Sequence, residues 1–118
     1  MTAIKMSRDT FDDRIRPDTR HHTYCTAIKY GGKREWDFAW RMASTVTSSQ
    51  HRAVLLATLA CSREPWLLSR YLWFTLDPES GIRKQDGKEL IVSVSRNPVG
   101  RFIAFDFIRE NFDALIDR

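Results

Sequence analysis

The chain has 118 residues, of which 42% are hydrophobic and 12% aromatic. This composition predicts one compact core rather than two, and it argues against a disordered chain. The formal net charge is +4, but the 19 basic and 15 acidic residues are interleaved without a run of like charges. Nucleic-acid binders usually cluster their lysines and arginines, so we expect no nucleic-acid partner.

The sequence contains no apolar stretch of the roughly 18 residues that a membrane span requires, so no span is expected in this chain. Residues 1–9 lack the apolar segment of a secretory signal. The sequence therefore indicates either a cytosolic protein or a piece of a longer one.

The first third of the chain predicts a leader and two helices. Residues 1–14 are polar and weakly patterned, so we expect a loose N-terminal leader there. A first helix is predicted from Pro17, a residue suited to a first helical turn, to the Gly31-Gly32 pair, where a helix ends easily. A second amphipathic helix is indicated by residues at i, i+4 and i+7: Trp36, Trp40 and Ala43.

The middle of the chain predicts two more helices. Residues 53–60 are apolar nearly all round, which is typical of a short buried helix. Ser62 is a candidate N-cap of a fourth helix that has Pro65 in its first turn. That helix would end before the turn residues 77–81. Its expected apolar stripe consists of Leu68, Leu72 and Leu76.

The last third predicts two helices and contains one ambiguous segment. Asp86 and Glu89 have capping-box spacing, and Asn97-Pro98 could start the last helix. Residues 90–95 alternate β-branched and polar side chains, which is a strand signal. Because no second convincing strand exists to pair with them, we interpret them as a buried helix. One face of the last helix is expected to carry Phe102, Phe105, Phe112 and Ile116.

About six helices joined by short turns predict an all-α fold. Antiparallel helical hairpins of this spacing fit an α-solenoid of HEAT or armadillo type. The hairpin sequences are too dissimilar to establish a repeat from identity.

Few residues are candidates for chemistry. Cys25 and Cys61 could clip neighbouring helices together, or could be two separate buried thiols. His22 and Cys25 are one helical turn apart and could supply half a metal site, with His21 or an acidic residue completing it, but exposed histidines are the simpler interpretation and we expect no metal. The group Ser48, Ser49 and His51 lacks the strand-turn-helix elbow and the acidic partner of a nucleophilic site.

Two further groups of residues have a structural interpretation. The tryptophans could be mistaken for a ligand cage, but helical spacing predicts that most of them pack between helices. A polar cluster follows the 77–81 turn, and we expect it to cap the next helix, with Asp86 at its start. The tryptophans are Trp36, Trp40, Trp66 and Trp73, and the polar cluster is Arg83, Lys84, Gln85 and Asp86.

Six short segments, taken in order, resemble one known family. They are Tyr24-Cys25-Thr26-Ala27-Ile28, Glu35-Trp36-Asp37-Phe38-Ala39-Trp40, Ala60-Cys61-Ser62, Arg70-Tyr71-Leu72, Ile82-Arg83-Lys84-Gln85-Asp86, and Asp106-Phe107-Ile108 with Asn111-Phe112. In these segments, residues 15–118 resemble part of the C-terminal helical domain of the zinc aminopeptidases. The similar types are aminopeptidase N, glutamyl aminopeptidase and endoplasmic-reticulum aminopeptidase.

The resemblance implies a domain without catalytic machinery of its own. The family holds zinc in a separate catalytic domain through a His-Glu-x-x-His helix, and none of His21, His22 and His51 is followed by Glu. A zinc hydrolase needs three protein ligands and a polarised water, so we expect this chain alone to be neither an enzyme nor a zinc binder. It resembles an internal fragment, a truncated isoform or a reduced relative.

The resemblance also implies a function and partners. In the family this domain covers the active-site cleft and shapes peptide access, so its partners are the catalytic domain and the peptide substrate. The alternatives are an autonomous helical module that binds proteins or itself, and part of an active zinc metalloaminopeptidase whose catalytic domain lies upstream. The cluster Arg83, Lys84, Gln85 and Asp86 could line the cavity over the zinc.

A disulfide is implied by the resemblance as well. Lumenal and cell-surface members join the cysteines that match Cys25 and Cys61. The bond would tie the first helix to the third and stabilise the fold by about 4 kcal/mol in the chain-entropy model. It requires an oxidising compartment, so the expected location is lumenal or extracellular.

Overall fold

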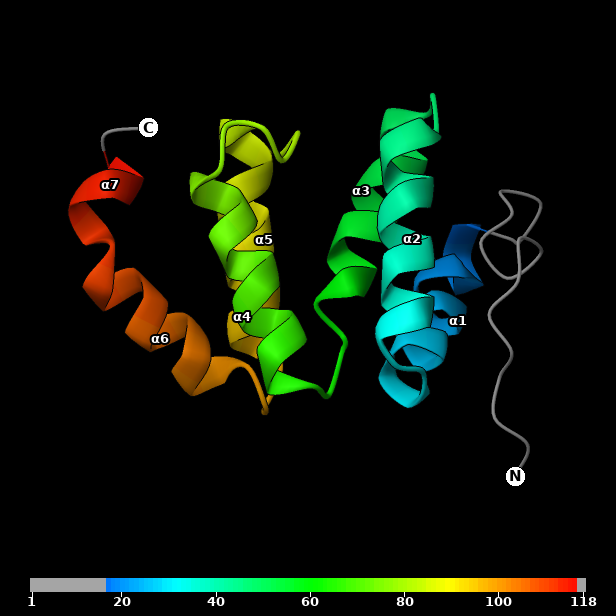
Figure 1. Cartoon of the computed structure of the whole chain (residues 1–118). Helices are drawn as coiled ribbons and strands as arrows, with labels where there is room; N and C mark the ends of the chain where they lie inside the picture. The colour runs from blue at the N-terminus through cyan, green and yellow to red at the C-terminus, as the bar shows by residue number, and fades with distance from the viewer. Residues whose placement is uncertain (1–16, 117–118) are drawn as a thin grey trace. The chain divides into compact units, whose positions relative to one another are not determined.

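The computed structural model describes residues 17–116, with side chains from His22 onward, and the expected leader at 1–14 lies outside this range. All regular secondary structure in the described residues is helical, without a strand, which confirms the predicted all-α class (Figure 1). The helices are α1 (Pro17–Tyr30), α2 (Lys33–Thr45), α3 (Ser49–Leu59), α4 (Pro65–Trp73), α5 (Lys84–Arg96), α6 (Arg101–Glu110) and α7 (Phe112–Ile116), with a 3-10 helix η1 (Phe74–Leu76) after α4.

The chain divides into two compact units between Ser62 and Arg63. The composition predicted one compact core, whereas the contacts of the chain divide into two units. The physical reason is that each helix packs mainly on helices close to it in sequence, so most contacts stay within one half of the chain.

The first unit consists of α1, α2 and α3, with α3 packed against both of the others. The start of α2 is fixed by Glu35, whose side chain accepts a hydrogen bond from the Gly32 N–H at 3.0 Å. The prediction of helices that end and begin at the Gly31-Gly32 pair is confirmed. The buried apolar residues of this unit are Tyr24, Ala27, Ile28, Trp36, Ala39, Ala43, Leu55, Leu56, Leu59 and Ala60.

Helix α3 begins four residues earlier than the apolar run 53–60 predicted. Its N-cap is Ser48, whose side chain accepts a hydrogen bond from the His51 N–H at 3.1 Å. The helix can begin with polar residues because the Ser48 side chain satisfies a backbone N–H that has no intrahelical partner. Hydrophobicity alone therefore placed the start too late.

In the second unit, α4 starts with Pro65 in its first turn, as predicted. The prediction of Ser62 as N-cap is wrong: Glu64 holds the cap position, without a side-chain cap bond, and Ser62 is buried. Because proline takes the first helical position, the cap must be the residue directly before it. The helix ends at Trp73, and Leu76 falls in η1 rather than in α4.

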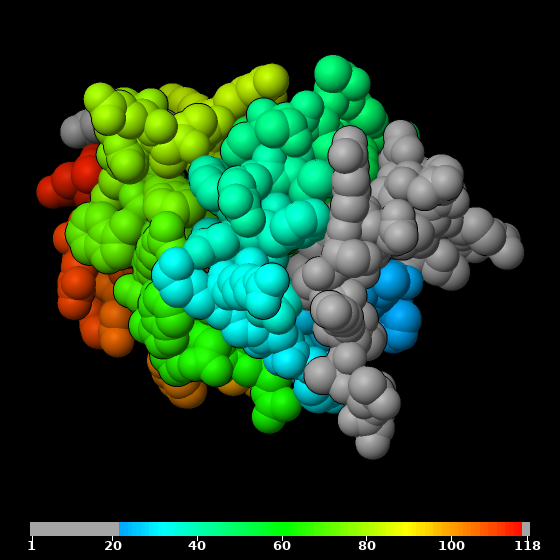
Figure 2. Space-filling model, turned by 45° about the vertical axis from the view of Figure 1, so that its right-hand side comes forward, coloured from blue at the N-terminus to red at the C-terminus, as the bar shows by residue number. Residues whose placement is uncertain are grey.

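The turn at residues 77–81 reverses the chain after η1. The Ser80 N–H donates to the Asp77 carbonyl at 3.1 Å, and Gly81 has a φ of 87°, a left-handed conformation that glycine adopts at little cost. Figure 2 shows this yellow-green segment at the molecular surface. The predicted turn is confirmed.

Helix α5 contains the ambiguous segment 90–95, so its interpretation as a helix is confirmed. Leu90 and Val94 are both buried one helical turn apart, and this packing outweighs the β-branched character of the segment. The predicted start at Asp86 is wrong: α5 begins at Lys84 and has Arg83 at its N-cap position.

The last predicted helix is two helices, α6 and α7, separated at Asn111. Asn97 and Pro98 lie in the turn before α6, where the Val99 N–H donates to the Asn97 side chain at 2.9 Å. The buried residues of α6 are Ala104 and Phe107, which the expected apolar face did not include. The four residues predicted to share that face are largely exposed: Phe102 at 74%, Phe105 at 61%, Phe112 at 55% and Ile116 at 60%.

Candidate functional site

A disulfide joins Cys25 in α1 to Cys61, two residues beyond the end of α3. The Cα atoms are 5.4 Å apart and the cysteines are separated by 36 positions. The bond lies within the first unit and closes a loop that contains the whole of α2. The pairing implied by the family resemblance is therefore present, and no free cysteine remains.

The serine and histidine group has a structural role. Ser48 caps α3, and Ser49 is the exposed first residue of that helix. The His51 ring is buried, and its Nε2 hydrogen-bonds with the Tyr24 hydroxyl of α1 at 3.1 Å. The imidazole is thus part of the packing between α1 and α3, as the absence of a nucleophile elbow suggested.

The half metal site considered at His22 does not assemble. His22 is exposed, and Cys25 is used in the disulfide. Within the described part of the chain, no three His, Cys, Asp or Glu side chains gather in a way that could hold a metal ion. The side chain of His21 lies outside the described residues.

The tryptophans differ in burial more than their spacing predicted. Trp36 is fully buried, and the half-buried Trp40 stacks on it with ring centroids 6.1 Å apart. Trp66 and Trp73 are each 50% exposed, which is more than packing between helices predicts. Trp73 nevertheless packs its ring edge-on against Phe107, with centroids 5.2 Å apart. Helix α4 has apolar side chains on more than one face, so some of them are exposed to solvent.

The polar cluster Arg83, Lys84, Gln85 and Asp86 lies at the N-terminus of α5. The first three side chains are exposed, and Asp86 is half-buried in the first turn. An acidic residue there interacts favourably with the positive end of the helix dipole, although Asp86 is not the predicted N-cap. Arg83 holds that position without a side-chain cap bond.

Lys84 of this cluster borders a groove of about 630 Å³ in the second unit, which we call the α5–α7 groove. One wall comes from one face of α5, and the other from the end of α6 and from α7. Thr75 of η1 lies at its floor, where it is buried. The remaining lining residues are Gly87, Lys88, Ile91, Val92, Ile108, Phe112, Leu115 and Ile116.

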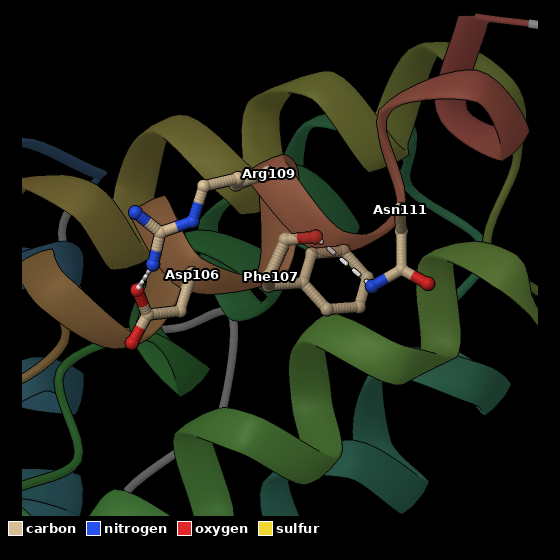
Figure 3. A network of polar contacts seen from close by, with 4 residues as sticks. All are labelled: Asp106, Phe107, Arg109 and Asn111. Carbon is tan, nitrogen blue, oxygen red and sulfur yellow. Dashed lines mark hydrogen bonds and ion pairs between the residues drawn. The ribbon is translucent and has the colours of Figure 1, made fainter.

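Asn111 creates the second wall of the groove. Its side-chain amide donates to the Phe107 carbonyl at 2.9 Å (Figure 3). Its backbone N–H also donates to that carbonyl, at 3.0 Å. These bonds satisfy a carbonyl of the last turn of α6, where intrahelical donors run out. The chain changes direction there, and α7 brings Phe112, Leu115 and Ile116 to the groove. Sequence reasoning missed this site because it treated residues 98–116 as one continuous helix; Asn111 was the available signal.

Comparison with known proteins places this helical architecture in a class. The family model described as the ERAP1-like C-terminal domain matches residues 2–118. Aminopeptidase N of Rattus norvegicus is 44% identical over 103 residues, which is 87% of this chain and 11% of the relative. Aminopeptidase N of Homo sapiens is 43% identical over 103 residues, 87% of this chain and 10% of the relative. Aminopeptidase Ey of Gallus gallus is 42% identical over 101 residues, 86% of this chain and 10% of the relative.

These matches define an aminopeptidase C-terminal domain as the class. The chain belongs to the ERAP1-like C-terminal domain family. It spans about a tenth of the length of the aminopeptidases that it matches. None of the described helices is both long and apolar enough to cross a bilayer.

Proposed function

We propose that this chain is a non-catalytic helical domain of a zinc aminopeptidase, where it covers the active-site cleft and shapes the access of peptides. The observation that carries the proposal is the family match over residues 2–118 together with 44% identity to an aminopeptidase N. The zinc and its catalytic machinery would be supplied by another domain of the parent protein. Within the described residues no group suited to holding a metal exists, which is consistent with that division of labour.

The helix arrangement supports a stacked architecture for the parent domain. Helices α1 to α3 pack mainly on one another, and so do α4 to α6, and contacts that stay local in the sequence are typical of HEAT and armadillo solenoids. We propose that the two units are successive elements of such a solenoid.

The disulfide supports a lumenal or extracellular location. Disulfides persist in oxidising compartments and are rare in the cytosol. A relative with 34% identity over 106 residues is named the thyrotropin-releasing hormone-degrading ectoenzyme of Rattus norvegicus, a name consistent with the cell surface. We propose the same kind of compartment for the parent of this chain.

The cluster at the start of α5 is the proposed contact with peptide. Arg83 and Lys84 are exposed cations on neighbouring positions, suited to the carboxylates of a bound peptide. A chimera tests this: the matching segment of the rat aminopeptidase N is replaced with this chain, and kcat/KM is measured for an aminoacyl anilide and for peptides of increasing length. The double charge reversal Arg83→Glu with Lys84→Glu should change the dependence on peptide length and leave anilide hydrolysis within about twofold.

The matched control is Arg41→Glu, an exposed position of α2 outside the cluster. It should leave both substrates unaffected. An unchanged length profile in the double variant would remove the cluster from the peptide path. Zinc-dependent anilide hydrolysis by the pure 118-residue chain would overturn the non-catalytic assignment.

A further inference from the structure

We draw no further inference here: the strongest candidate, the shallow hollow at the C-terminal end of α4 lined by Arg70, Trp73, Phe74, Leu76 and Asp77, combines aromatic side chains with charges of both signs, but nothing in the structure shows what covers it.

Discussion

The indole N–H of Trp36 donates a hydrogen bond to the backbone carbonyl of Leu59 at 3.0 Å. Leu59 is the last residue of α3, so its carbonyl is one of those that an α-helix leaves without an intrahelical donor. Trp36 is fully buried in α2 and places both its apolar rings and its single donor in the interior. One side chain thus packs α2 on α3 and completes the hydrogen bonding of the α3 C-terminus.

Removing the Trp36 donor is therefore expected to be costly. Trp36→Phe deletes the N–H and leaves the Leu59 carbonyl unsatisfied in the core, and it also removes ring volume. The free energy of unfolding should fall by about 2–4 kcal/mol, measured by urea denaturation followed by circular dichroism. Trp73→Phe is the matched control, because Trp73 is 50% exposed. A loss in the control as large as in Trp36→Phe would contradict this assignment.

The disulfide gives a second expected outcome. In the variant Cys25→Ser with Cys61→Ser, the free energy of unfolding should decrease by up to about 4 kcal/mol, since the cross-link no longer restricts the unfolded loop of 36 positions. Denaturant midpoints with and without reductant provide the measurement. The wild-type midpoint should fall on reduction, and the midpoint of the double variant should not respond. Free thiols in unreduced wild-type protein, detected by mass spectrometry, would be incompatible with the pairing.

The N-cap residue Ser48 gives a third testable prediction. Its side chain accepts from the His51 N–H, so Ser48→Ala removes the N-cap of α3 and should lower stability by about 1 kcal/mol. Ser49 is the next residue, exposed, in the first turn of the same helix. Ser49→Ala should change stability by less than about 0.5 kcal/mol. Thermal unfolding of the two variants side by side distinguishes a cap from a generic effect of losing a serine.

Local signals determined much of this fold in advance. The Gly31-Gly32 pair, Pro65 and the 77–81 turn each specify backbone geometry through one or a few residues, and the helices end or begin where these residues predicted. The α5 segment was harder, since residues 90–95 have β-branched side chains in alternation. The absence of a partner strand resolved it, and that is information about the whole chain rather than about the segment.

The failures concern features that depend on tertiary contacts. Spacing puts Phe102 and Phe105 on one face of α6 but does not say whether that face is turned inward, because a helix can have two apolar sides. The α5–α7 groove depends on the direction change at Asn111, which was treated as the interior of a helix. The cysteine pairing was predicted only through the family resemblance, since two cysteines alone also fit two separate thiols.

The difference in burial between two phenylalanines of α6 leads to the last prediction. Phe107 is 5% exposed and packs against Trp73, whereas Phe105, two positions earlier on the same helix, is 61% exposed. Phe107→Ala should lower the free energy of unfolding by about 3–5 kcal/mol, because it removes a buried ring and leaves a cavity. Phe105→Ala should change it by less than about 0.5 kcal/mol. The two variants have the same composition and helix propensity, so the difference between them measures burial alone.

Urea denaturation of both variants makes the comparison, with the intrinsic fluorescence of the tryptophans as a second probe. The Phe107 ring touches Trp73, so Phe107→Ala should also alter the emission of the folded protein, and Phe105→Ala should not. Equal destabilisation by the two substitutions would mean that the outer face of α6 is covered in solution. That face would then be an interface rather than a solvent-exposed surface.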